Sequence, residues 1–428
     1  MNYPDSVHFL YSLGNEIKTA KLGLDRVELL LDALGRPQER TRFVHVAGTN
    51  GKGSTCAMIE AALRASGRHT GLFTSPHLAE PTERIRIDGA PVSAAAFAAY
   101  FDRVHAAVEH LVAAGALEAH TTYFETVTAM AFVAFAEARC ETAVLEVGLG
   151  GRLDATNVVQ PVLCVITPVD FDHEAWLGRS LEAIAGEKAG ILKSGVPAVI
   201  ARQRAEAAGV IRQRAIEVGA PLTHLEDWTI EALELTARGS RFRLRGEREF
   251  TIECPLAGEH QVENAATAAV ALTRLSLATP AIEGGIAAAR WPGRLERVSE
   301  HPEIVLDGAH NPAGARALAA YIDRFYANRN VTLIFGAMRD KALDEIGGIL
   351  FPRARRLIFT APNQPRAAAP DAILRLVDRP DARAAATLAA ALALVRDAAP
   401  DDVVFITGSL FLVAEARALL PVIIEAKP

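Results

Sequence analysis

The sequence predicts an α/β protein with two domains, each built around a mostly parallel β-sheet. Short apolar runs alternate with amphipathic stretches along the 428 residues, and strands that alternate with helices are typical of parallel sheets joined by crossover helices. A second series of this kind begins near Glu303. At roughly 150 residues per domain the length suggests two or three domains, each large enough to bury a core without disulfides.

In the first series, apolar runs predict buried strands over residues 42–47, 143–147 and 162–167. Amphipathic periodicity predicts helices over 55–66 and 126–138.

The second half shows two further patterns. Apolar and polar residues alternate around a glycine over 241–253, which predicts an antiparallel hairpin. From Glu303 the strands EIVLD, VTLIFG, RRLIFT and DVVFITG follow, with a helix from Pro312 and a final helix at the end. The segment Ile282–Arg297, which contains WPGR, is the predicted hinge, so we expect domains over 1–296 and 297–428.

The composition excludes several classes of protein. With 45 basic and 51 acidic residues the formal charge is −6, whereas nucleic-acid and membrane-surface proteins need a concentrated basic patch. The four cysteines are scattered, without a CxxC pair, so neither a disulfide framework nor a zinc site is predicted, and a reducing cytoplasm is expected. No signal peptide or membrane span is expected either.

A glycine-rich loop between a strand and a helix is the sharpest local motif. It comprises Gly48, Thr49, Asn50, Gly51, Lys52, Gly53 and Ser54. Such a loop turns backbone N–H groups towards phosphate oxygens, the lysine supplies a mobile charge, and the serine hydroxyl can ligate Mg²⁺. Its spacing departs from GxxxxGK[ST], which argues against ordinary GTPases and transport ATPases. The alternative is a glycine turn with a solvated lysine.

A magnesium site needs hard oxygen ligands at a strand end. Glu146 lies in the run AVLEVGLGG, and a buried carboxylate without a partner would be costly. The alternative is a salt bridge to Arg152. The next strand leads to Asp170, Asp172 and His173, at the end where open α/β sheets place their sites. We expect His173 to be a metal ligand, although imidazole on Mg²⁺ is unusual; a capping or core histidine is the alternative.

Two lysines, Lys188 and Lys193, occur in IAGEKAGILKSG. One of them could neutralise a transferring phosphoryl group. Composition alone favours two solvated lysines.

The full set of motifs resembles the folylpolyglutamate synthase and dihydrofolate synthase family. The motifs that carry the resemblance are, in order, AGTNGKGS, FTSPHL, YFE, LEVGLGGRLDATN, DHEAWLG, GEKAGI, GEHQVENAATA, WPGRLE and DGAHNPAG, from about residue 21 to beyond 410. The family is related to the muramyl amino-acid ligases. This relationship implies a P-loop nucleotide-binding amino-terminal domain with a mostly parallel sheet and a smaller Rossmann-like carboxyl-terminal domain.

The resemblance also implies roles for individual residues. It implies that the phosphate loop binds ATP together with Asn264, Arg294, Asp307 and His310, the last two from the carboxyl-terminal domain. It implies two Mg²⁺ sites at Ser54, Glu146 and His173, a carbamylated Lys188 and a monovalent cation. Catalytic roles fall to Lys52, Lys188 and His173. The blocks that line the pterin and pteroate pocket match Ser75, Phe124 and Asp154.

The activity implied by the resemblance is ATP-dependent ligation of L-glutamate to dihydropteroate and to reduced folates through an acyl phosphate. A monomer without nucleic-acid or membrane partners is expected, whose two domains close on ATP and exclude water. Three alternatives remain: polyglutamylation only, a muramyl-type ligase, and a nucleotide-dependent switch. TSPHL, YFE and DGAHNP favour the folate branch, and no NKxD motif supports a switch. The preferred folate and the chain length are not set by the sequence.

Overall fold

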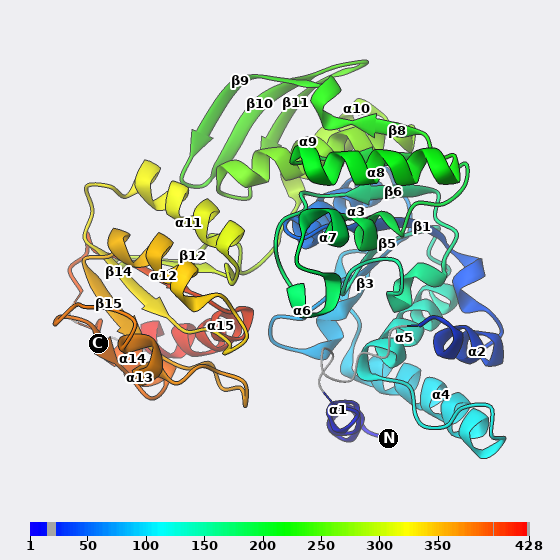
Figure 1. The fold of residues 1–428 in the computed structure, drawn as a ribbon, viewed down its shortest axis with the longest axis horizontal. Helices are drawn as coiled ribbons and strands as arrows, with labels where there is room; N and C mark the ends of the chain where they lie inside the picture. Colours follow the sequence, from blue (N-terminus) through cyan, green and yellow to red (C-terminus); the bar gives the residue numbers. More distant parts are fainter. Residues whose placement is uncertain (15–22, 397, 426–428) are drawn as a thin grey trace. The chain divides into compact units, whose positions relative to one another are not determined.

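The computed structural model describes residues 1–14, 23–396 and 398–425 (Figure 1). Residues 15–22, which include the start of the family resemblance near residue 21, lie outside the described residues. The chain divides into two compact units. The amino unit comprises Met1–Ala232, Phe242–Glu253 and Glu263–Ala289, and the carboxyl unit comprises Leu233–Arg241, Cys254–Val262 and Arg290–Pro428. The boundary expected between residues 296 and 297 stays a prediction.

An eight-stranded, mostly parallel sheet forms the centre of the amino unit. Its strand order is β4 (Ala90–Pro91), β3 (Ile85–Ile87), β2 (Thr70–Phe73), β5 (Thr142–Glu146), β1 (Arg42–Ala47), β6 (Leu163–Ile166), β7 (Ala198–Ile200) and β8 (Leu222–His224). The strands β2, β5, β1, β6, β7 and β8 pair in parallel in this order, whereas β3 and β4 pair antiparallel at the other end of the sheet. The three strands predicted in this half are therefore confirmed as β1, β5 and β6.

The helices of the first 290 residues follow the strands as crossovers or pack around them. They are α1 (Tyr3–Ser12), α2 (Asp25–Ala33), α3 (Lys52–Ala65), α4 (Ala94–Ala113), α5 (Tyr123–Glu137), α6 (Glu174–Leu177), α7 (Leu181–Ala189), α8 (Ala205–Val218), α9 (Glu259–Arg274) and α10 (Thr279–Ala288). Short 3₁₀ turns in this part of the chain lie at Pro37–Arg40, Pro81–Arg84, Ala155–Val158 and Leu225–Asp227, and a further one lies in the carboxyl unit at Phe351–Arg353.

Both predicted helices exist but begin three residues earlier than expected. At α5 the reason is a capping box, in which the Thr122 hydroxyl accepts from the backbone N–H of Glu125 and the Glu125 carboxylate accepts from that of Thr122. At α3 the reason is Gly51, whose left-handed conformation (φ 84°) ends the loop and lets the helix start at Lys52.

The predicted hairpin is confirmed as part of a three-stranded sheet, β9 (Thr229–Thr236), β10 (Gly239–Arg245) and β11 (Glu249–Cys254), with β10 in the middle. The strands are joined by turns too short for a crossover, so they run antiparallel. Along β10 and β11 apolar side chains such as Phe242 and Phe250 are buried, while the polar residues between them are exposed.

A six-stranded sheet forms the carboxyl unit. Its order is β12 (Glu296–Glu300), β13 (Glu303–Asp307), β17 (Val403–Thr407), β14 (Val331–Phe335), β15 (Arg356–Phe359) and β16 (Arg383–Ala384). Among the strands of this sheet that the structure describes, β12 pairs antiparallel and the others pair in parallel. The helices are α11 (Pro312–Phe325), α12 (Leu343–Leu350), α13 (Pro370–Leu374), α14 (Leu388–Ala393) and α15 (Leu410–Glu425). The predicted strands and both predicted helices of this half are confirmed.

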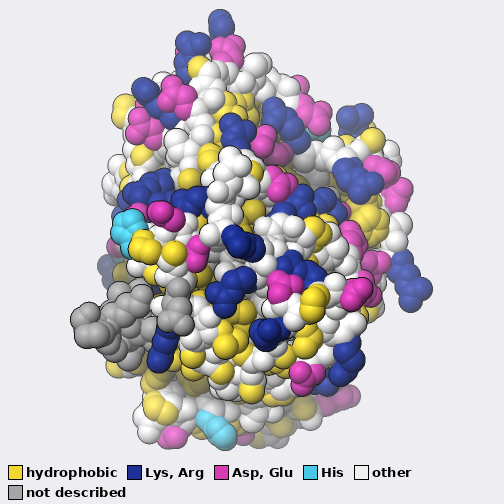
Figure 2. Space-filling model, turned by 90° about the vertical axis from the view of Figure 1, so that its left-hand side faces the viewer, with side chains coloured by type: hydrophobic (Ala, Val, Ile, Leu, Met, Phe, Trp, Pro, Cys, Tyr) yellow, Lys and Arg dark blue, Asp and Glu magenta, His cyan; other side chains and the backbone are white. Residues whose placement is uncertain are grey.

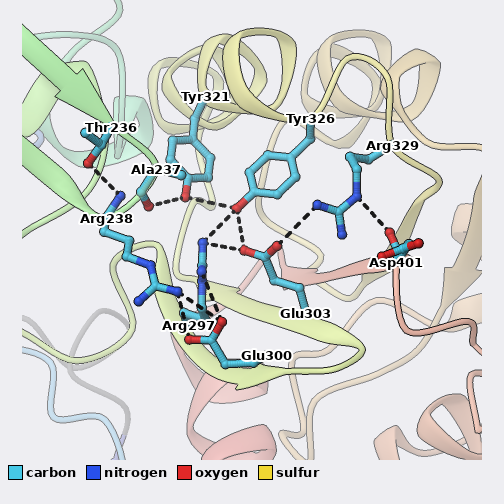
Figure 3. Close-up of polar contacts among 10 residues, drawn as sticks. All are labelled: Thr236, Ala237, Arg238, Arg297, Glu300, Glu303, Tyr321, Tyr326, Arg329 and Asp401. Atoms are coloured by element: carbon cyan, nitrogen blue, oxygen red, sulfur yellow. Dashed lines mark hydrogen bonds and ion pairs between the residues drawn. The ribbon is translucent and has the colours of Figure 1, made fainter.

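A polar network crosses the carboxyl unit around the buried carboxylate of Glu303 (Figure 3). Glu303 pairs with Arg297 at 2.5 Å and accepts a 2.6 Å hydrogen bond from the Tyr326 hydroxyl. Tyr321 donates to the carbonyl oxygen of Ala237 at 2.8 Å. The network thus ties the start of β13 to the end of α11 and to the β9–β10 turn.

On the face drawn in Figure 2, basic and acidic side chains are interspersed, with apolar side chains between them. Among the described residues, no helix is both long enough and apolar enough to span a bilayer. Cys56, Cys140, Cys164 and Cys254 are all buried free thiols.

Candidate active site

Four of the predicted sites in the amino unit lie at or just after the carboxyl ends of strands that end at one edge of its sheet. The phosphate loop follows β1, Ser75 follows β2, Glu146 ends β5 and His173 follows β6. Because β1, β2, β5 and β6 run in parallel, their carboxyl ends share an edge, which is where ligands bind in open α/β sheets. Glu146 pairs in register with Val46, two residues before the loop.

The phosphate loop packs against Asn264, a residue far along the chain. A side chain on Gly51 would collide with the amide of Asn264 in α9, so this position has room only for glycine. Since α3 begins at Lys52, the N–H groups of its first turn point out of its amino terminus, where an anion is stabilised. The hydroxyl-bearing Ser54 is buried in this turn.

Part of the loop is already anchored to the segment after β6. The backbone N–H groups of Thr49 and Asn50 donate to the carbonyl oxygen of Pro168 at 3.0 and 3.4 Å. The Thr49 hydroxyl donates to the carbonyl oxygen of Asp170 at 2.9 Å. These amides hold the loop in place, so the N–H groups that start α3 are the ones that could meet a phosphate group at this loop.

Two lysines converge on the first residue of the loop. Lys188 Nζ donates to the Gly48 carbonyl oxygen at 2.8 Å, and Lys52 Nζ donates to the same oxygen at 3.1 Å. Lys188 is 5% exposed. Burial, with the nearby charge of Lys52, lowers the pKa of Lys188 to about 7. The interpretation of this lysine as solvated is therefore wrong, because its stem packs beneath the loop.

The carboxylate of Glu146 has a partner in the segment that follows the neighbouring strand β2. It is 5% exposed, and its Oε2 atom accepts a 3.0 Å hydrogen bond from the backbone N–H of Ser75. Arg152, the ion-pair partner considered for Glu146, forms a 2.8 Å salt bridge with Glu187. Glu146 is the last residue of β5 and not a mid-strand residue, which brings its carboxylate to the edge of the sheet.

His173 has an unusual backbone. It precedes the short helix α6 in the left-handed region (φ 53°, ψ 34°), a conformation that costs a non-glycine residue energy and is concentrated at functional sites. Its backbone N–H donates to Asp172 Oδ1 at 2.9 Å, and its ring lies near the same carboxylate. Asp172 also lies within electrostatic range of Lys188.

The residues matched to the pterin pocket shape the glycine turn after β5. Asp154 Oδ2 accepts from the backbone N–H groups of Gly148 and Leu149 at 3.0 and 2.9 Å. Burial raises the pKa of Asp154 despite these hydrogen bonds. The ring of Phe124 lies against Gly148, where a larger residue would collide with it.

Three predicted residues belong to the carboxyl unit and form a cluster of their own. Asp307, at the end of β13, accepts from the backbone N–H groups of Leu295 and Ala309, both at 3.0 Å. Burial raises the pKa of Asp307, and the charge of Arg294 opposes this shift. His310 pairs through Nδ1 with the Gly308 carbonyl oxygen at 2.8 Å.

Two supporting residues were missed by the sequence analysis. Thr156 donates to Asp154 Oδ1 at 2.5 Å and also contacts the buried ring of His45 at 2.8 Å. Gln203 braces the segment after β6, where its Oε1 accepts from the Val169 N–H at 2.9 Å and its Nε2 donates to the Thr167 carbonyl oxygen at 3.1 Å. Thr156 lies inside the LDATN block, which is a signal that could have revealed it; Gln203 lies in no motif.

Comparison with known proteins agrees with this architecture. The sequence matches the Mur ligase middle domain over residues 46–272 and the Mur ligase glutamate ligase domain over residues 293–410. It is 36% identical to a dihydrofolate synthase/folylpolyglutamate synthase of Bacillus subtilis, over 94% of this chain and 95% of that protein.

The chain belongs to the dihydrofolate synthase/folylpolyglutamate synthase family of Mur ligases. Solved structures of this family match the fold over nearly its whole length. A Mycobacterium tuberculosis folylpolyglutamate synthase complexed with ADP and AMPPCP has a TM-score of 0.91 at 35% identity, covering 98% of this chain and 99% of that one. An Escherichia coli protein in complex with DHPP and ADP has a TM-score of 0.88 at 32% identity, covering 99% and 98%. The predicted family and fold class are confirmed.

Proposed function

We propose that this protein ligates L-glutamate, in an ATP-dependent reaction, to dihydropteroate and to the γ-carboxyl group of reduced folates. The observation that carries the proposal is that Lys52 and Lys188 both donate to the carbonyl oxygen of Gly48. Glu146, whose carboxylate is buried, is the last residue of β5 at the same edge of the sheet. Family relatives that carry both enzyme names support the two acceptors.

The reaction requires two displacements. A carboxylate oxygen of the acceptor attacks the γ-phosphorus of ATP, so that ADP leaves and an acyl phosphate forms. The amino group of L-glutamate then attacks the acyl carbon, the attacking nitrogen loses a proton to solvent, and phosphate leaves as the amide forms. No covalent bond to the enzyme is needed. The protein must instead align two anions that repel each other, and Lys52 with the amino terminus of α3 offsets this repulsion.

Mg²⁺ would be held by Ser54, Glu146 and His173. The hydroxyl and carboxylate oxygens fit a hard cation, and both Ser54, at the end of the loop, and Glu146, at the end of β5, are buried. When bound, Mg²⁺ neutralises charge on the phosphates. The Ser75 N–H keeps the Glu146 carboxylate in one orientation for this role.

Lys188 suits carbamylation, in which its neutral amine adds to CO₂ and releases a proton. A pKa of about 7 leaves a large fraction of the amine neutral near neutral pH, and the resulting carbamate would lie close to the positive charge of Lys52. The resemblance supports this modification and also a monovalent cation. It supports the contribution of Asn264, Arg294, Asp307 and His310 to nucleotide binding and that of Ser75, Phe124 and Asp154 to pterin binding.

The test of the function is ADP release by the purified protein with Mg²⁺, ATP and L-glutamate. Dihydropteroate, a reduced folate, a muramyl nucleotide and no acceptor are compared. Release with the first two acceptors supports the proposal. Release with the reduced folate alone restricts the activity to polyglutamylation, and release with the muramyl nucleotide alone contradicts the proposal. Sedimentation of the same sample checks the proposed monomer, while the proposed cytoplasmic location needs a separate fractionation.

A further inference from the structure

A second group of chemically competent side chains lies on α4 and on the segment between α4 and α5, apart from every residue assigned above. It consists of His105, Glu109 and His120, which we call the His–Glu–His cluster. His105 and Glu109 are one helical turn apart, so they project from the same face of α4. One ligand atom from each of the three residues lies within 4.8 Å of the other two.

The spacing of the two imidazoles matches the requirement of a metal ion. His105 Nδ1 and His120 Nε2 are 3.1 Å apart. Two nitrogen ligands at zinc distances in a tetrahedral site lie about 3.3 Å apart. The two nitrogen atoms share a hydrogen bond, so a metal ion would take the place of the proton between them, with the carboxylate of Glu109, one helical turn from His105, as the third donor.

The ring of His120 is held in the state that a ligand needs. Its Nδ1 atom lies 3.0 Å from the carbonyl oxygen of Thr121, which can only accept, so the proton resides on Nδ1 and the lone pair on Nε2. A backbone carbonyl on the other ring nitrogen is the usual support of a histidine ligand.

Aromatic contacts fix the planes of both rings. The Phe9 ring lies 4.6 Å from the His105 ring and 5.2 Å from the His120 ring, and Phe101 stacks on His105 at 5.3 Å. Arg26 donates to the His120 carbonyl oxygen at 2.9 Å while its charge is paired with Glu125. Metal binding would thus order few additional groups, which favours affinity.

We propose that the His–Glu–His cluster binds one divalent cation of the zinc class, with water in the fourth position. Two imidazoles and one carboxylate select zinc or a neighbouring transition metal over Mg²⁺ and Ca²⁺, which prefer oxygen donors. The ion has a structural role. It links α4 to the capping box that starts α5, the helix that carries Phe124.

The test is Zn²⁺ titration by calorimetry of metal-stripped protein in excess Mg²⁺, with melting temperature as a second readout. The wild type is compared with His105→Gln and with Glu109→Gln, whose exposed side chain can be replaced with little effect on the fold. His110→Gln is the matched control, because His110 is an exposed histidine on the same helix outside the cluster.

We expect the wild type and His110→Gln to bind one more Zn²⁺ ion per chain than His105→Gln. Glu109→Gln should bind this ion with an affinity more than about 10-fold lower, because the loss of a group that merely supports a metal ligand already lowers metal affinity by this factor. Zn²⁺ should raise the melting temperature of the wild type and of His110→Gln equally, that of Glu109→Gln less, and that of His105→Gln least, because it binds the folded state. Equal stoichiometry and affinity in all four proteins would overturn the proposal. Such a result would not bear on the proposed ligase function, because none of the three cluster residues is assigned to the ligase site.

Discussion

Lys188 Nζ lies 2.8 Å from the carbonyl oxygen of Gly48, an oxygen that also accepts from Lys52. Two amines share one carbonyl at the start of the phosphate loop. Their mutual repulsion and the burial of Lys188 both disfavour a second positive charge. The first carbonyl of the loop is therefore hydrogen-bonded to a buried amine whose charge depends on pH.

The stability of the protein should depend on pH through Lys188. Its pKa falls from 10.5 to about 7 on folding, so the unfolded chain binds more protons between these values, and the free energy of unfolding rises with pH there by at most about 1.4 kcal/mol per unit. In Lys188→Met this contribution is absent, so the free energy of unfolding of the variant should rise relative to that of the wild type as the pH falls towards 7. Urea unfolding in CO₂-free buffer measures the difference. A difference that stays constant across this window contradicts the account.

Removal of Lys52 should abolish turnover and leave the fold intact. The Lys52 side chain donates to the carbonyl oxygens of Gly48 and Thr49 in its own loop. In the proposed reaction it would instead offset the negative charge of the phosphates. We expect Lys52→Ala to lower kcat by at least about 100-fold. Circular dichroism should give a wild-type spectrum. Turnover close to the wild-type rate would remove Lys52 from the mechanism.

Two substitutions of Glu146 separate its charge from its hydrogen bond. Glu146→Gln retains an acceptor for the Ser75 N–H but lacks the negative charge for Mg²⁺, so it should fold normally and lose turnover. Glu146→Ala should lose turnover and also about 1 kcal/mol of stability, because the Ser75 N–H is left without this acceptor. Chemical denaturation compares the two. Normal activity of Glu146→Gln would exclude a role in metal binding.

Carbamylation of Lys188 should appear as a dependence of activity on bicarbonate. Enzyme stripped of CO₂ should gain turnover when bicarbonate is added, and Lys188→Ala should not respond. Carbon NMR with labelled bicarbonate checks for the carbamate directly. Activity that is indifferent to bicarbonate, with no carbamate signal, would assign Lys188 a purely electrostatic role.

The network of Figure 3 predicts a stability effect in the carboxyl unit. Glu303→Gln weakens charged hydrogen bonds to Arg297 and Tyr326 and should cost about 2 kcal/mol. Arg238→Ala removes an exposed ion pair with Glu300 and should cost less than about 1 kcal/mol. Thermal unfolding ranks the two variants, and the reverse order would contradict this description of the network.

The sequence predicted those features that depend on local pattern. Strand β1 was placed at the residues it occupies, and strand β13 and the start of α11 at Pro312 also agree, because apolar runs and proline signal their elements without help from distant residues. The glycine-rich loop and the position of Glu146 before a glycine turn were likewise visible in the sequence.

Features that depend on distant contacts could not be predicted from residue patterns. The burial of Lys188 beneath Gly48 is set by the packing of α7 against the loop after β1, 140 residues away in the chain. The same holds for Asn264 against Gly51 and for His120 beside His105, which no motif connects. Side-chain burial is a tertiary property, so composition favoured the solvated state for a lysine that the fold encloses.

The most direct test of the proposed function is the mass of the product formed from dihydropteroate, ATP and L-glutamate. A product heavier than dihydropteroate by one glutamate residue, formed with one ADP per bond and absent in Lys52→Ala, is the predicted result. ATP hydrolysis at the same rate with and without the acceptor, and no change in the mass of dihydropteroate or of a reduced folate, would contradict it.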